Sequence, residues 1–135
     1  MLQKKFFAVL FVMLFFAGTT VLSTAMSQPR VTFQFDIENE LKEGFYDPER
    51  HTLKIRSNNY SFSDSGYLTL TQSEKDPTLY TATVSLPRSM VNRNLNYQFV
   101  IVSNNRIIKE DFIRYVQIKD SPQKLDVLSF DYFEL

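Results

Sequence analysis

The sequence predicts an all-β protein, an immunoglobulin-like antiparallel β-sandwich of about seven or eight strands. Two observations lead to this fold class. Short runs of alternating apolar and polar residues recur along the chain, and turn-forming residues separate them at intervals of about 8–12 residues. Beyond the N-terminal leader, no stretch of about ten residues or more shows the apolar period of about 3.6 residues that marks an amphipathic helix.

The first 25 residues are typical of a signal peptide. Lys4 and Lys5 precede an uncharged, apolar run over residues 6–18, and Ser23 and Ala25 place small residues before a cleavage point after Ala25. The run is shorter than the stretch of about 20 apolar residues that a membrane-spanning helix needs. We therefore expect export to the periplasm or the medium, most readily from a bacterial envelope. An uncleaved N-terminal anchor is the alternative.

The remaining chain, over residues 28–135, is long enough for a single β-sandwich domain. From residue 26 onward it carries 13 Lys and Arg against 15 Asp and Glu, scattered rather than in blocks. We therefore expect no nucleic acid and no other polyanion as a partner, and no membrane attachment after leader cleavage. The absence of cysteine excludes disulfides and a lipid-modified cysteine.

The clearest strand lies over residues 31–38, where apolar and polar residues alternate without fault. This pattern predicts a strand with one buried face. Similar runs predict further strands over residues 51–57, 67–71, 79–86, 113–119 and 125–130. Polar and turn-forming residues predict loops over residues 39–50, 58–66, 72–77 and 88–94.

Residues 95–110 read as a strand, a turn and a second strand. Val100 and Val102 are apolar on one face, and four apolar residues occupy the other face: Leu95, Tyr97, Phe99 and Ile101. This predicts an interior strand that is covered on both sides. Asn104-Asn105 is expected to form a two-residue turn of type I′, because Asn tolerates the positive φ of that geometry.

Aromatic residues in and beside the loop over 58–66 suggest a ligand platform. We expect it to consist of Tyr60, Phe62 and Tyr67, with the amides of Asn58 and Asn59 beside them. The alternative is that the rings fold inward and cap the core. Asn59-Tyr60-Ser61 also matches the N-glycosylation sequon.

The order of the motifs resembles that of starch-binding domains and related carbohydrate-binding, immunoglobulin-like sandwiches. The likeness covers residues 31–118 and is carried by VTFQFDIEN, GFYDPERHTLKIRSNNYSFSDSGYLTL, LYTATVSLP, NLNYQFVIV and IIKEDFIR. It implies a sugar site in which the loop tryptophan of the family falls on Phe62, a lysine on Gln98 and the hairpin tryptophan on Lys109. The chain contains no tryptophan, so Tyr60 and Phe62 would have to supply the stacking rings.

A catalytic or metal-dependent function is not expected, and neither is a cofactor. The only histidine is His51, at the start of a predicted strand, where a surface role is more natural than a place in a catalytic triad. The sequence has no spacing of zinc ligands. Asp36, Asp47 and Glu49 offer a calcium site only as an alternative to ordinary solvated carboxylates.

The sequence thus predicts an exported, non-catalytic module that binds a polysaccharide or oligosaccharide of the α-glucan type weakly, through loop aromatics. The alternative is a protein-interaction or structural sandwich of the cell envelope that has lost sugar binding. A coplanar pair of exposed rings would favour sugar. An exposed apolar surface or an unprotected edge strand would favour a protein partner. The last residues, 132–135, are apolar enough to predict docking on the core.

Overall fold

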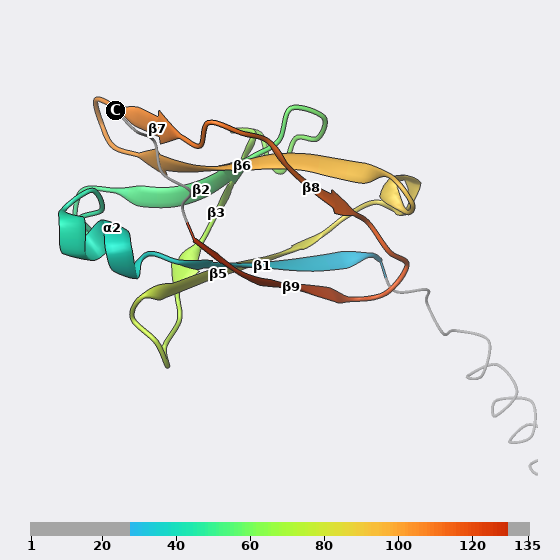
Figure 1. Ribbon diagram of the computed structural model, residues 1–135. Helices are drawn as coiled ribbons and strands as arrows, with labels where there is room; N and C mark the ends of the chain where they lie inside the picture. The colour runs from blue at the N-terminus through green and yellow to red at the C-terminus, as the bar shows by residue number, and fades with distance from the viewer. Residues whose placement is uncertain (1–27, 130–135) are drawn as a thin grey trace, which may run out of the picture.

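The computed structural model describes residues 28–129. The predicted signal peptide over residues 1–25 and the docking of residues 132–135 lie outside this part of the chain. Two sheets lie face to face, which confirms the all-β sandwich (Figure 1). The elements are β1 (Arg30–Asp36), α2 (Glu38–Glu43), β2 (Thr52–Arg56), β3 (Tyr67–Thr69), β4 (Thr71–Gln72), β5 (Leu79–Ser85), η2 (Arg88–Met90), β6 (Asn94–Val102), β7 (Ile107–Lys109), β8 (Arg114–Gln117) and β9 (Gln123–Ser129).

The first sheet, sheet A, has the strand order β4-β5-β1-β9, and the second, sheet B, has the order β3-β2-β6-β7 with β8 also paired to β6. β1 and β9 run parallel, and the other strand pairs are antiparallel. One parallel pair therefore interrupts the antiparallel pattern that the sequence predicted. It sets the last described strand beside the first and completes sheet A. The described helices are too short and too polar to cross a membrane.

The core lies between β1 of sheet A and β6 of sheet B. The predicted alternation of β1 is confirmed, because Phe33 and Phe35 are fully buried while their polar neighbours are half-buried. Phe33 meets Tyr97 with ring centroids 5.1 Å apart, and Phe35 meets Phe99 at 4.3 Å. Burial of each such ring contributes about 1.5–3 kcal/mol to stability. These contacts fix how the two sheets face each other.

The loop predicted over residues 39–50 contains a short helix, α2. It begins where the Glu38 N–H donates to Asp36 Oδ1 at 2.9 Å, and it ends at Gly44, whose φ of 77° is left-handed. Lys42 pairs with Glu38 one turn earlier, at 2.9 Å. A helix of six residues makes fewer than about two turns, so it shows no apolar period that sequence analysis can detect.

The strand predicted over residues 67–71 is divided between the two sheets. β3 pairs with β2 in sheet B, and β4 pairs with β5 in sheet A. The chain crosses at Leu70, which is buried and donates its N–H to Leu53 O at 3.0 Å.

The turn between β6 and β7 has the predicted two residues, Asn104 and Asn105, because the Ser103 N–H donates to Arg106 O at 2.8 Å. Its predicted type I′ geometry is wrong. Among the described residues, Asn92 is the only one other than glycine with a positive φ. Strand β6 is an interior strand of sheet B, as expected, but no further layer of residues 28–129 lies over its outer face (Figure 1).

β7 and β8 pair with the same edge of β6, and an irregular connection over residues 110–113 separates them. The buried Glu110 side chain stabilises this connection. Its Oε2 accepts the Phe99 backbone N–H at 3.2 Å, and its Oε1 lies 2.7 Å from Arg114 Nη2. The carboxylate thus satisfies a main-chain donor that the interrupted ladder leaves on β6.

Candidate functional site

Strand pairing brings together three of the predicted site residues on the outer face of sheet B. Arg56 of β2 is registered against Tyr67 of β3 on one side and against Gln98 of β6 on the other. Directly opposite residues of neighbouring strands point to the same face of a sheet. Tyr67, Arg56 and Gln98 therefore form one row across three strands.

The next row contains the third predicted residue, Lys109. Val100 of β6 is registered against Lys54 of β2 and against Lys109 of β7. Leu53, Ile55 and Phe99 alternate with these residues and are fully buried in the core, so the two rows point away from it. We call the five polar and aromatic members the basic face: Lys54, Arg56, Tyr67, Gln98 and Lys109.

Two sets of contacts hold side chains of the basic face in place, one within the face and one to the connection between β7 and β8. Lys54 Nζ lies 5.5 Å from the centroid of the Tyr67 ring, within cation–π range. The Gln98 amide donates to Glu110 O at 3.0 Å and to Phe112 O at 3.3 Å. Val100 is fully buried between the two lysines. The face thus carries side chains held by specific contacts, with its cations on β2 and β7.

The predicted loop residues Tyr60 and Phe62 lie elsewhere and do not form an open platform. Both rings are half-buried and pack against the core, and the Phe62 ring makes an edge contact with Phe33 at 6.4 Å. Their own rings are 5.4 Å apart and inclined at 76°. Two rings at this angle cannot present one coplanar surface to a sugar.

Of the two predicted loop amides, Asn59 is hydrogen-bonded to β6, whereas Asn58 is exposed to solvent. Asn59 donates to Asn94 O at 2.8 Å and accepts the Asn96 N–H at 3.1 Å, which fastens the loop to the start of β6. Asn58 is exposed. Together with Tyr60 and Asn59 it lines a shallow depression of about 370 Å³ that is completed by Ser57, Ser61 and Gly66. The depression follows the last residue of β2, so it borders the basic face.

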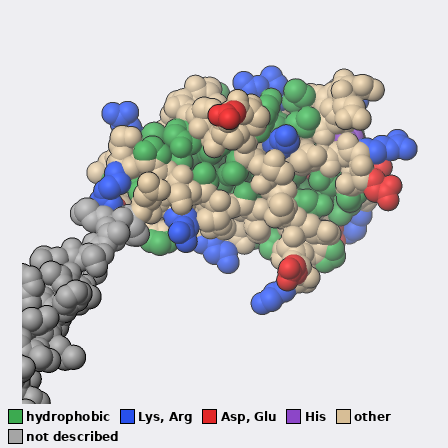
Figure 2. Space-filling view, turned by 180° about the vertical axis from the view of Figure 1, so that it is seen from behind, with side chains coloured by type: hydrophobic (Ala, Val, Ile, Leu, Met, Phe, Trp, Pro, Cys, Tyr) green, Lys and Arg blue, Asp and Glu red, His purple; other side chains and the backbone are tan. Residues whose placement is uncertain are grey.

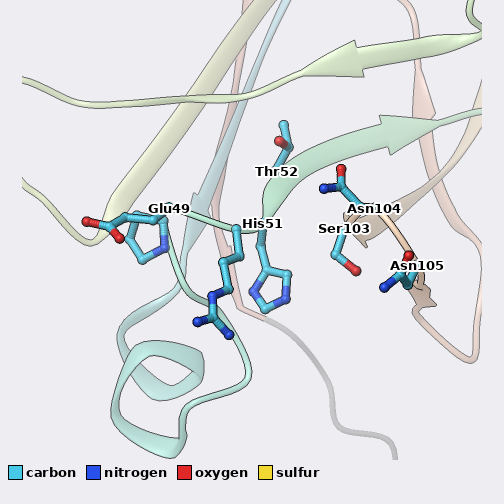
Figure 3. A pocket seen from close by; sticks show the side chains of 8 residues that line it. Glu49, His51, Thr52, Ser103, Asn104 and Asn105 are labelled. Atoms are coloured by element: carbon cyan, nitrogen blue, oxygen red, sulfur yellow. The ribbon is translucent and has the colours of Figure 1, made fainter.

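A second, more polar cleft lies at the opposite end of the sandwich (Figure 3). It has a volume of about 710 Å³ between the loop before β2 and the β6–β7 turn, and it is lined by Pro48, Glu49, Arg50, His51, Thr52, Ser103, Asn104 and Asn105. His51 Nδ1 accepts the Asp47 N–H at 2.8 Å, so the neutral ring carries its proton on Nε2. Sequence analysis missed the cleft because two turns some fifty residues apart form it.

Neither a metal site nor a catalytic triad is evident among residues 28–129. No group of three metal-ligating side chains gathers there. In particular, the acids of the alternative calcium site, Asp36, Asp47 and Glu49, do not gather into such a group. No described hydrogen bond joins a serine hydroxyl to His51.

The side of the sandwich formed by β7, β8 and β9 carries exposed apolar residues. Tyr115 of β8 is 66% exposed and Val127 of β9 is 51% exposed. Tyr115 is registered against Asn96 and Ile107 against Val102, so both point to the outer face of sheet B, beside the basic face, whereas Val127 lies in sheet A. Phe112 and Ile113 are also exposed. β7 and β8 have no strand on their outer side among the described residues. On the side of the molecule facing away from the viewer of Figure 1, hydrophobic side chains show in patches over the middle of the face, and Lys and Arg lie mainly toward the rim (Figure 2).

A comparison with models of known protein families finds no match, and a comparison with curated proteins finds none either. The resemblance to starch-binding domains therefore rests on the order of motifs alone.

Proposed function

We propose that this chain is an exported, non-catalytic glycan-binding module that binds its ligand on the basic face. The observation that carries the proposal is the convergence of Tyr67, Gln98 and Lys109. They lie on three different strands, and the register of sheet B sets them in two adjacent rows. The motif order resembling starch-binding domains supports the same class of function.

The chemistry of the face suits a carbohydrate polymer. A pyranose ring stacks its apolar C–H face on an aromatic side chain such as Tyr67. Its hydroxyl groups then meet the amide of Gln98 and the donors of Lys54 and Arg56. The bordering depression with Asn58 and Tyr60 extends the polar surface beyond the end of β2. A flat sheet face accepts a chain of sugars without a deep pocket.

Affinity electrophoresis tests the proposal. The purified protein is run through gels that contain starch, xylan, β-glucan or polygalacturonate, beside the variants Tyr67→Ala and Phe45→Ala. Phe45 is a matched control, because its exposed ring lies at the opposite end of β2. We expect at least one polysaccharide to retard the native protein and the Phe45 variant, and Tyr67→Ala to remove the retardation. Migration that no polysaccharide changes would contradict glycan binding.

A second candidate function, protein binding, is favoured by the exposed apolar edge of β7 and β8. An extended segment of a partner can add to an unpaired edge strand through main-chain hydrogen bonds, while exposed apolar side chains contact it. If this is the function, Tyr115→Arg abolishes binding of a purified envelope partner and Tyr67→Ala leaves it intact. The opposite pattern would assign the binding to the basic face.

A further inference from the structure

We infer that the ligand of the basic face is an acidic glycan, one that carries carboxylate or sulfate groups along its chain. This inference rests on the proposed function and specifies its ligand. It departs from the neutral α-glucan that the motif resemblance implies, and from the expectation that the chain has no polyanionic partner.

The first argument is the concentration of positive charge. Lys54 and Arg56 are two residues apart on β2, so their Cα atoms are separated by about 6.5–7 Å. Lys109 lies two strands away from Lys54, at about 10 Å, because neighbouring strands are about 4.8 Å apart. Three cations therefore occupy a patch about as wide as the Debye length at physiological salt, about 8 Å.

The second argument is that no ion pair within residues 28–129 joins an acid to these cations. The ion pairs among the described residues join Lys42 to Glu38, Arg50 to Asp47, Arg88 to Asp120 and Arg114 to Glu110, and none involves the basic face. The rows hold Thr, Tyr, Gln and Val besides the cations. Asp64 and Asp111 are exposed in adjoining loops, outside the rows. Like charges in neighbouring positions repel, so an anionic ligand would relieve this repulsion.

The third argument concerns the stacking rings. In the resemblance to starch-binding domains, two tryptophans hold neutral glucose rings, and their positions are Phe62 and Lys109. Phe62 packs against the core, and Lys109 presents an exposed cation on β7. A lysine binds a carboxylate or sulfate far better than the face of a neutral sugar. Tyr67 remains to stack one ring beside the charges.

A binding titration with matched charge variants tests the inference. The triple variant Lys54→Gln, Arg56→Gln and Lys109→Gln removes the cations of the face. The control triple variant Lys75→Gln, Lys119→Gln and Lys124→Gln removes the same charge from exposed positions outside sheet B. Circular dichroism establishes that both variants are folded. The probes are polygalacturonate, starch and single-stranded DNA, each at low and at high salt.

We expect polygalacturonate to bind more tightly than starch and DNA, and high salt to weaken its binding. Loss of each charge contact should weaken binding by about 1.5- to 5-fold, so the face triple variant should bind about 3- to 100-fold more weakly. The control variant should lose less than about 3-fold through its change in net charge.

Other outcomes separate this inference from the proposed function. Binding of starch that exceeds that of polygalacturonate and does not respond to salt would overturn the acidic ligand and leave glycan binding standing. Equal binding of DNA would show a general polyanion surface and overturn the glycan assignment. If neither polysaccharide binds, both the inference and the proposed function fail.

Discussion

Two buried carboxylates, Glu110 and Glu40, have opposite surroundings. The Glu110 side chain is fully buried and is paired with Arg114 and the Phe99 N–H. Glu40 of α2 is 2% exposed, and neither of its carboxylate oxygens has a hydrogen-bond partner among the described residues. The Glu110 carboxylate should therefore stabilise the fold, whereas the Glu40 carboxylate should destabilise it at neutral pH.

Replacing Glu110 with Ala is expected to lower the free energy of unfolding by about 3–5 kcal/mol, because it leaves the largely buried Arg114 charge without its carboxylate and the Phe99 N–H without its acceptor. Denaturant unfolding measures the change. The control is Lys42→Ala, which breaks an exposed ion pair with Glu38 and should cost less than about 1 kcal/mol. Equal losses in the two variants would contradict the structural role of the Glu110–Arg114 pair.

Replacing Glu40 with Met is expected to raise stability at neutral pH by about 1–3 kcal/mol, since an apolar side chain has no unmet hydrogen bonds. Burial raises the pKa of the Glu40 carboxyl by more than the residue's own backbone N–H lowers it, and the nearby carboxylates of Asp36 and Glu43 raise it further. The folded protein thus holds this proton more tightly than the unfolded chain does. Its free energy of unfolding should fall as pH rises from the ordinary glutamate pKa through the raised one.

Urea unfolding at several pH values measures this dependence. In Glu40→Met the decline over that pH window should be smaller than in the native protein. The exposed Glu49 supplies the control, since Glu49→Met should leave the slope unchanged. A Glu40 variant that is less stable than the native protein at neutral pH would show that this carboxylate has a stabilising partner.

At the scale of elements, α2 depends on its left-handed C-terminal residue. A Cβ atom added at Gly44 would meet nothing within 4 Å, so only backbone strain opposes a substitution there. Gly44→Ala is therefore expected to cost about 1–2 kcal/mol, the penalty for a left-handed conformation in an L-residue. Thermal unfolding checks this, with Gly44→Asn as a milder comparison because Asn tolerates this region. An unchanged melting temperature in Gly44→Ala would contradict the strain.

The elements that sequence analysis predicted well are those whose pattern matches their burial. The alternation of β1 is strict because one of its faces lies in the core, and the paired β6–β7 strands join at the turn that the two asparagines indicate. α2 was missed because six residues are too few to show a period. The crossing at Leu70 was missed because an alternating run keeps its pattern when it changes sheets.

At the scale of the whole molecule, the basic face was beyond sequence reasoning. Lys54 and Arg56 are more than fifty residues from Lys109, and the charges look scattered along the chain. Only the register of β2 and β7 against β6 gathers them. A loop pattern predicts Tyr67 as a site residue, and the motif order predicts Gln98 and Lys109. That these three side chains share one face of sheet B depends on the strand pairing, which neither the loop pattern nor the motif order predicts.

The most direct test of glycan binding on the basic face is an NMR titration of the isotope-labelled protein with oligogalacturonate. We expect the amide and side-chain signals of Arg56, Tyr67 and Gln98 to shift in a saturable way, together with those of Lys54 and Lys109. Signals of β9 around Val127 in sheet A and of the cleft around His51 should stay in place. Shifts confined to those two regions, or none at saturating oligosaccharide, would contradict the assignment of the site.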